Sequence, residues 1–196
     1  MRGICFVEDL FLQVVTGEKT ETRRIIKPLV DYKDPAWFTK PVEKRDNWDD
    51  YPNQHIANMY KNKPGVRFIF PVIGAIIKPR YQPGEIVFLK EPYGRISGVM
   101  FYAFDYPPHS EMRTSFKGWA NKLFMAASDA RHFIKITGVS VERAWEITEE
   151  GAIREGVANR TEFEKKWAKI NGISSWKPNP YVFVYSFEYL PNYKIC

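Results

Sequence analysis

The chain has 196 residues, of which 44% are hydrophobic and 27% charged, with a formal net charge of +6 and a pI of about 9.2. This length fits one domain with a hydrophobic core and room for a sizeable insertion. Two cysteines and three scattered histidines exclude a disulfide framework and show no metal-ligand spacing, so we expect no metal and no cofactor. The N-terminus lacks the apolar core of a signal peptide, and the longest apolar run, residues 68–77, is too short to cross a bilayer. We therefore expect a cytoplasmic protein without membrane contact, whose positive charge favours a polyanion such as RNA.

The N-terminal part of the chain predicts a short helix followed by a basic segment. Residues 8–16 have acids in the first turn and an apolar stripe, and Gly17 is a plausible stop. The sequence Lys19-Thr20-Glu21-Thr22-Arg23-Arg24 follows, and we expect it to be a loop. Residues 29 to about 80 mix polar residues, prolines and aromatics with weak periodicity. They predict an irregular insertion whose aromatic side chains pack against other parts of the protein.

The second half of the chain is rich in strand patterns. Alternating or β-branched runs predict strands over residues 85–90, 100–104, 133–137 and 181–189, with 139–145 extending or pairing with the third. Two short helices are expected between the last strands. Thr148 caps one over residues 148–155, and Thr161 begins the other over 161–170, with Glu164 completing a capping box.

These elements predict an α+β fold for the whole chain. We expect a small, mostly antiparallel β-barrel with the short helices packed outside it. Residues 1–196 are expected to form a single domain, with the irregular insertion at about 29–80.

The basic segment after the first helix admits two interpretations. Its cations can hold phosphate, helped by hydroxyls and backbone amides, or they form a solvated loop. The lysine at 19 also has a chemical interpretation, because neighbouring arginines or partial burial lower the pKa of a lysine and let it act as a base. Thr22, three residues on, is then a nucleophile or a hydrogen-bond donor.

A group of glutamates near residue 150 is the acidic counterpart. Glu149 and Glu150 suit the first turn of a helix, where acids complement the helix dipole. Glu155 fits that explanation less well, because a glutamate in the last turn opposes the dipole. It is therefore the candidate that faces the basic segment, either pairing with Lys19 or shuttling a proton.

Aromatic residues next to cations form a third pattern. Trp119 with Lys122, Phe124 with Arg131, and Trp176 with Lys177 are either base-stacking surfaces or ordinary core and cation–π packing.

The order of these motifs resembles that of the ASCH family, whose members share the PUA-like barrel. The resemblance is carried by Gly17-x-Lys19-Thr20-x-Thr22-x-Arg24, Tyr81-Gln82-Pro83-Gly84-Glu85-Ile86, residues 141–157, Trp167-x-x-Ile170-Asn171-Gly172, and residues 179–187. It covers residues 4–27 and 81–190 and is similar to the longer ASCH proteins of phages and prophages. The insertion lies outside it.

The resemblance implies a protein that acts on RNA or its building blocks. Some small bacterial members of the family are amidohydrolases that remove the acetyl group of N4-acetylcytidine. Their working lysine, threonine and glutamate fall on Lys19, Thr22 and Glu155, and Arg24 matches a basic position that holds substrate. This chain differs from them in its insertion, in Arg23 replacing an apolar residue, and in an extra segment around 105–130.

Three functions stay open on the sequence. The first is an RNA-binding protein with a basic cleft, the second an amidohydrolase acting on N4-acetylcytidine or a related acylated nucleoside, and the third a phage-type accessory protein that binds a protein partner. The expected catalytic residues are Lys19, Thr22 and Glu155. The residues expected to contact substrate or RNA are Thr20, Arg23, Arg24, Lys90 and Arg131.

Overall fold

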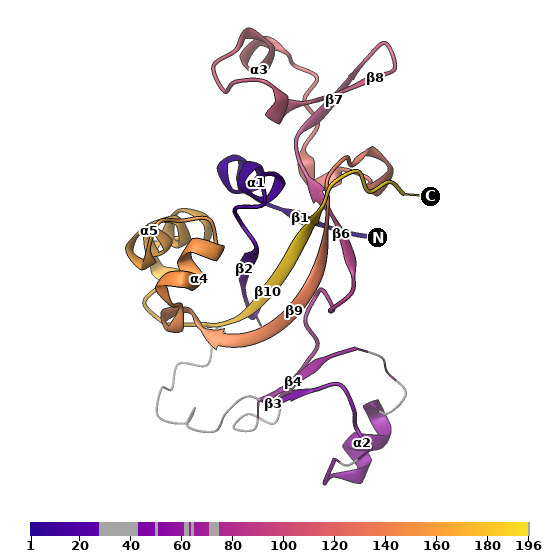
Figure 1. The fold of residues 1–196 in the computed structure, drawn as a ribbon, viewed down its shortest axis with the longest axis vertical. Helices are drawn as coiled ribbons and strands as arrows, with labels where there is room; N and C mark the ends of the chain where they lie inside the picture. Colours follow the sequence, from indigo (N-terminus) through magenta and orange to yellow (C-terminus); the bar gives the residue numbers. More distant parts are fainter. Residues whose placement is uncertain (28–42, 50, 61–62, 64, 71–74, 196) are drawn as a thin grey trace. The chain divides into compact units, whose positions relative to one another are not determined.

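A computed structural model describes the chain except for residues 28–42, 50, 61–62, 64, 71–74 and 196. Both helices and strands occur along the described part, which confirms a mixed α+β protein (Figure 1). The chain divides into two compact units, each made of separate stretches of sequence. Unit 1 comprises Met1–Thr20, Ile86–Lys135 and Phe187–Cys196, and unit 2 comprises Glu21–Glu85 and Ile136–Ser186.

Each unit has its own helices and strands. Those of unit 1 are β1 (Arg2–Cys5), α1 (Glu8–Val15), β6 (Ile86–Lys90), β7 (Tyr93–Ile96), β8 (Val99–Tyr102) and α3 (Glu111–Ser115). Those of unit 2 are β2 (Glu21–Ile25), β3 (Glu43–Arg45), α2 (Gln54–Tyr60), β4 (Arg67–Phe70), β5 (Ala75–Ile77), α4 (Glu149–Arg154) and α5 (Arg160–Asn171). The long strands β9 (Phe133–Arg143) and β10 (Tyr181–Leu190) have residues in both units.

The strands form three sheets. Their orders are β1-β6-β9-β10-β2, β3-β4-β5 and β7-β8. Among the pairings with a described register, β1 with β6 is parallel and the others are antiparallel. The sheets are thus mostly antiparallel, as expected, while the closed barrel stays a prediction.

In unit 1, helix α1 begins and ends close to where the sequence pattern predicts. Leu10, Phe11 and Val14 are buried along its apolar stripe. Gly17 follows the helix with φ 81°, a left-handed conformation that glycine adopts without steric cost. The Phe11 ring packs edge-on against Phe104, with 4.9 Å between centroids, so the helix is fixed by aromatic contacts as well as by burial.

The strand expected at 100–104 is present as β8, but its expected place in the main sheet is wrong. β8 pairs with β7 as a separate hairpin in which Ile96 lies opposite Val99. Ser97 and Gly98 form the two-residue connection, and both have positive φ, 49° and 82°. Such a turn matches the twist of two adjacent strands, so the local hairpin forms in place of a long-range pairing.

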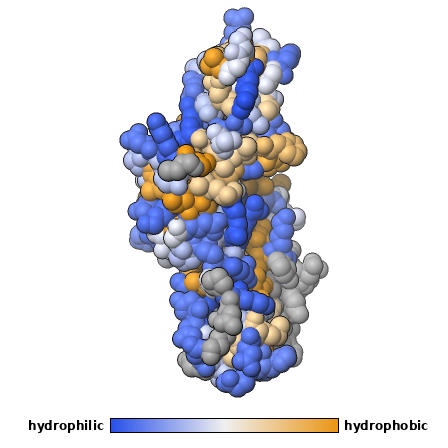
Figure 2. All heavy atoms as spheres, turned by 90° about the vertical axis from the view of Figure 1, so that its right-hand side faces the viewer, coloured by the Kyte–Doolittle hydropathy of each residue, from blue (hydrophilic) through white to orange (hydrophobic). Residues whose placement is uncertain are grey.

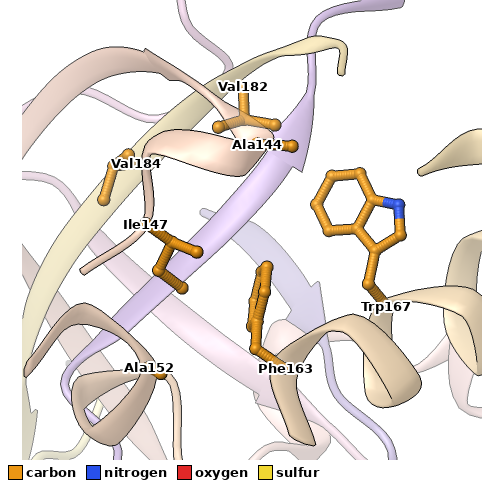
Figure 3. Close-up of a cluster of buried hydrophobic side chains, with 7 residues drawn as sticks. All are labelled: Ala144, Ile147, Ala152, Phe163, Trp167, Val182 and Val184. Carbon is orange, nitrogen blue, oxygen red and sulfur yellow. The ribbon is translucent and has the colours of Figure 1, made fainter. Parts of the chain in front are cut away.

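In unit 2, a hydrophobic core lies between the last two helices, strand β10 and the turn that follows β9. Figure 3 shows Phe163 and Trp167 rising from α5 toward the strands and the turn that follows β9. The buried members of this core are Ala144, Ile147, Ala152, Phe163, Trp167, Val182 and Val184. Ile170, three residues farther along α5, is 45% exposed. Helix α5 therefore contributes two buried side chains to the core, Phe163 and Trp167, one turn apart.

The start of α5 differs from the prediction. The helix begins at Arg160, and the side chain of Asn159 accepts a hydrogen bond from the N–H of Glu162 at 2.9 Å. Asn159 is therefore the N-cap, and the capping box expected for Thr161 and Glu164 is wrong. Asparagine is at least as good an N-cap as threonine, and it stands where the chain is still extended. The cap of α4 is as predicted, because the Thr148 hydroxyl accepts from the N–H of Gly151 at 3.0 Å.

Part of the expected insertion is more regular than its sequence indicates. The described residues between 43 and 77 contain β3, β4, β5 and α2, whereas residues 29–42 lie outside the described part. All four residues of β4 are buried, so no alternation of polar and apolar residues marks it as a strand. Trp48 is 1% exposed, which fits the expectation that the aromatics of this segment pack.

The face drawn in Figure 2 is mostly hydrophilic, with hydrophobic residues gathered in separate patches. Phe124 in unit 1 and Ile173 in unit 2 are the most exposed large apolar side chains of the described part, at 80% and 87%. No helix in that part is both long and apolar enough to span a bilayer.

The cap of α5 gives a test of this description. Asn159→Ala should lower the free energy of unfolding by about 1 kcal/mol, because the N–H of Glu162 loses its acceptor. Thr161→Ala, at an exposed position two residues on, should change it by less than about 0.5 kcal/mol. Urea denaturation followed by circular dichroism measures both, and a larger loss for Thr161→Ala than for Asn159→Ala would reassign the cap to Thr161.

Candidate functional site

Few polar side chains are buried in the described part of the chain. The polar and charged residues in this group are Lys19, Thr22, Arg23, Arg67, Glu91 and Glu155. Three of them are the expected catalytic residues. Buried charges are uncommon unless they are paired or functional, so the candidate functional site is looked for among these residues.

The segment expected to be a basic loop is in part a strand. Residues 21–25 form β2, which pairs with β10 so that Thr22 lies opposite Tyr185 and Arg24 opposite Phe183. The loop assignment is therefore wrong for these residues. Pairing with the β-rich strand β10 outweighs the weak strand preference of a charged segment, and charged side chains are usual on edge strands.

The strand divides its side chains between two faces. Successive side chains of a strand point to opposite sides, so Thr22 and Arg24 share one face while Arg23 projects from the other. On the Thr22 side, the Tyr185 hydroxyl accepts a hydrogen bond from the N–H of Arg80 at 3.0 Å. Burial raises the pKa of Tyr185 to about 12, so the phenol next to Thr22 is neutral.

On the other face, Arg23 is surrounded by acceptors. Its Nε donates to Glu142 Oε1 at 2.6 Å, and its Nη1 lies 3.4 Å from Glu21 Oε2. The guanidinium carbon lies 5.9 Å from the centre of the Phe163 ring. The Arg23 side chain is only 3% exposed, so RNA contact by Arg23 stays a prediction, and it would have to compete with these partners.

Glu155 joins helix α4 to the edge of β2. It follows the last residue of α4, and its N–H donates to the carbonyl of Gly151 at 3.0 Å. Its Oε1 accepts a hydrogen bond from the backbone N–H of Arg23 and lies 3.5 Å from Arg23 Nη1. Glu155 is 6% exposed, and the unfavourable position at a helix end that the sequence indicates is offset by these donors.

Lys19 belongs to unit 1, where it is 1% exposed. Its Nζ lies 5.6 Å from the centre of the Phe6 ring, and its N–H donates to the carbonyl of Gln13 at 3.0 Å. The carbonyl of the next residue, Thr20, accepts from the N–H of Phe187 at 2.9 Å. The side chain of this lysine is thus buried against an aromatic ring and is not solvated.

Two further cations expected to contact RNA have protein partners in unit 1. Arg131 donates through Nε and Nη2 to the two oxygens of Glu91, each at 2.9 Å, and through Nη1 to Asp105 at 2.9 Å. Its guanidinium lies 4.1 Å from the centre of the Tyr102 ring. Lys90 donates to the carbonyl of Leu123 at 2.5 Å. RNA contact by Arg131 and Lys90 stays a prediction, and it would have to compete with these partners.

Glu91 is the acid that sequence reasoning missed in this unit. It is 1% exposed, and burial raises its pKa above the ordinary value while the hydrogen bonds and charge of Arg131 lower it. Beside it, His132 Nδ1 lies 2.7 Å from the Tyr189 hydroxyl. Burial and the charge of Arg131 lower the pKa of His132 to about 4, so this ring is neutral near pH 7. Nothing in the local sequence marks Glu91, because its partner Arg131 lies 40 residues away.

The described residues give no candidate metal centre. No group of three or more His, Cys, Asp or Glu side chains within them is arranged to hold a metal ion.

Comparison with known proteins shows only distant structural similarity. No family model matches it, and no curated protein matches it. Among solved structures, the chain is similar to protein EF3133 from Enterococcus faecalis V583, whose crystal structure is described as family-model DUF984. The identity is 11% and the TM-score 0.44, over 100% of this chain and 84% of that one. A likeness at that level carries no argument for fold or function.

The Arg131 contacts predict that this residue stabilises the fold. Arg131→Gln leaves the buried carboxylate of Glu91 without its cation, and should lower the free energy of unfolding by about 3 kcal/mol. The comparison variant is Arg95→Gln, which breaks an ion pair to Asp129 on a side chain that is 59% exposed. It should cost less than about 1 kcal/mol. Urea titrations measure both, and equal losses would show that Glu91 does not depend on Arg131.

Proposed function

We propose that this protein is an ASCH-type protein with a PUA-like barrel that recognises a nucleoside, free or within RNA, and hydrolyses its N-acyl group. The observation that supports this is the burial of the three residues to which the family resemblance assigns chemistry, Lys19, Thr22 and Glu155. A residue that merely holds phosphate stays accessible to solvent. Buried ionisable groups are the kind whose proton affinity a protein can adjust for catalysis.

Covalent geometry limits how far apart two of these residues can be. Lys19 and Thr22 are three residues apart, so their Cα atoms are separated by at most ~11 Å. Glu155 is held by Arg23, the residue that follows Thr22 in the chain.

The proposed reaction is an attack of oxygen on the acyl carbonyl. The neutral form of Lys19 accepts a proton from the Thr22 hydroxyl or from water, and the oxygen forms a bond to the carbonyl carbon. Arg24 balances the negative charge that develops on the carbonyl oxygen. The bond from carbon to the amine nitrogen then breaks, and a proton from the lysine, or one returned through Glu155, goes to the leaving amine. If Thr22 attacks, water hydrolyses the resulting ester in a second step.

The enzyme test uses variants that keep side-chain volume, because all three residues are buried. With N4-acetylcytidine as substrate, Lys19→Met, Thr22→Val and Glu155→Gln should each lower kcat by at least about 10²-fold, the low end for a positioned acid or base. KM should change little, since these groups act mainly in the transition state. Acetate release measures the rates.

The exposed Lys27 provides the matched control, and Lys27→Met should keep the rate of the parent. If Thr22→Val loses much less activity than Lys19→Met, water is the nucleophile. A parent protein that releases no acetate from a panel of N-acylated nucleosides contradicts the hydrolase proposal.

RNA binding without catalysis is the second candidate, and a group of cations in unit 2 favours it. The charge of Arg24 acts on Tyr185, whose hydroxyl accepts the N–H of Arg80. Lys78 and Arg80 have exposed side chains, and Arg24 is half-buried. Because Arg23 is occupied by glutamates, we assign phosphate contact to Arg24, Lys78 and Arg80 in this proposal.

The RNA proposal predicts a specific salt dependence. With about three phosphate contacts, the log–log slope of affinity for single-stranded RNA against salt should be roughly −2. Arg80→Gln should reduce the magnitude of that slope by about 0.7, the contribution of one contact on a single strand. Lys165→Gln, on the exposed side of α5, should leave it unchanged. Fluorescence anisotropy at several salt concentrations measures the slope, and absence of binding at low salt rules out this candidate.

A further inference from the structure

Trp145 is held by hydrogen bonds although nearly half of it is exposed. It lies in the turn that follows β9 and is 45% exposed. Its backbone N–H donates to Asn179 Oδ1 at 2.8 Å, and its indole Nε1 donates to the carbonyl of Trp176 at 3.0 Å. Its own carbonyl accepts from Arg160 Nη2 at 2.7 Å. The indole is therefore fixed in orientation while the residue is partly open to solvent.

The loop that holds Trp145 is anchored on the core of unit 2. The ring of Trp176 packs edge-on against Phe163 and Trp167, with centroids 5.9 and 5.8 Å away. Asn179 donates its N–H to the carbonyl of Trp176 at 2.9 Å and has φ 47°. That left-handed conformation is uncommon outside glycine, and asparagine is among the residues that adopt it most readily. The acceptors that orient Trp145 are thus themselves fixed.

Other apolar side chains of this loop add to the exposed surface. Trp176 is half-buried, and its ring centre lies 6.5 Å from that of Trp145. Ile173, three residues before Trp176, is 87% exposed. An aromatic side chain that is both exposed and fixed is typical of a binding surface, because little conformational freedom is lost when a partner packs against it.

The lysines of this part of the chain favour an anionic partner. Residues 165–187 contain no Asp or Glu but four lysines, which are Lys165, Lys166, Lys169 and Lys177. Lys177 is exposed and directly follows Trp176, whose carbonyl binds the indole of Trp145. Aromatic rings beside cations are the combination that binds single-stranded nucleic acid, because bases stack on the rings while the cations attract the backbone.

Two acids near Trp145 are matched by two arginines. Glu146 accepts the N–H of Arg143 at 2.7 Å, and Glu149 accepts the N–H of Arg160 at 3.1 Å. Counted with the exposed Lys177, these are three cations and two acids. The sign of the charge is therefore complementary to a polyanion and unfavourable for a basic protein partner.

We propose that Trp145 is a stacking platform for a base of single-stranded RNA. The inference deepens the proposed recognition of RNA and rests on it: Arg24 and Arg80 beside Tyr185 contact phosphate, and the indole receives a base. All four bases have a π-face, so the platform adds affinity without selecting a sequence. A duplex gains nothing from it, because its bases are stacked and paired with one another.

The test is the affinity for a fluorescein-labelled single-stranded oligoadenylate, measured by fluorescence anisotropy at several salt concentrations. Trp145→Leu should weaken binding by about 5-fold or more, the low end for the loss of one base stacked on an aromatic ring. Because stacking releases no counterions, the log–log slope against salt should stay that of the parent. Trp145→Phe keeps a ring and should restore most of the affinity.

Two controls accompany this measurement. Met59→Ala changes an apolar side chain of similar exposure, 47%, on α2, and should leave the affinity unchanged. An RNA duplex of the same length should bind the parent and Trp145→Leu equally. Quenching of tryptophan fluorescence by the unlabelled oligoadenylate is a second readout, and Trp145→Phe should lose most of that quenching while it still binds.

Equal affinities of the parent and Trp145→Leu for the oligoadenylate overturn the inference and leave RNA recognition standing without this platform. A changed salt slope in Trp145→Leu also overturns it, because the loss then comes from displaced cations. If Trp145→Leu does not fold, unchanged quenching in Trp145→Phe overturns it. A parent dimer that dissociates in Trp145→Leu, with RNA affinity unchanged, shows that the surface binds a second copy. A parent that binds no RNA rejects RNA recognition and the platform together.

Discussion

The hydrogen bond from the N–H of Arg23 to Glu155 is the constraint around which unit 2 is organised. β2 is the last strand of its sheet, and a buried N–H on an edge strand needs an acceptor that the sheet cannot supply. Glu155 supplies it from the end of α4. That contact links the end of the helix to the strand, and because Gly151 has no Cβ the guanidinium of Arg23 has room beside the helix.

Once a carboxylate is buried for this purpose, its charge has to be matched. Arg23 provides the match and is in turn held by Glu142 and Glu21. Breaking one member of such a group leaves an uncompensated charge, so the residues depend on one another. The same physics operates in unit 1, where the buried Glu91 pairs with Arg131, whose guanidinium also lies over the ring of Tyr102. Both arginines therefore have a structural role, because each neutralises a buried carboxylate, and RNA binding would have to compete with that role.

This arrangement changes the balance between the functional hypotheses. A basic loop open to solvent would favour phosphate binding through Lys19, Arg23 and Arg24 together. Strand pairing instead separates Arg23 from Thr22 and Arg24 by placing them on opposite faces. The burial of Lys19, Thr22 and Glu155 supports the hydrolase hypothesis. The cations Arg24 and Arg80 around Tyr185 support the hypothesis of RNA binding.

The sequence by itself determined the elements whose signals are local. The stripe and stop of α1, the Thr148 cap of α4 and the β-rich run of β10 all specify structure within a few residues, and each is found where predicted. Glu155 also stood out locally, as an acid at the wrong end of a helix. Tertiary structure alone decided what depends on distant partners. β2 is a strand because β10 pairs with it. Arg23 can be buried because Glu142 and Glu155 accept its hydrogen bonds, and Glu91 can be buried because Arg131 donates to it. Whether a charged side chain is buried and paired cannot be predicted from the residues next to it, because its partners come from distant parts of the chain.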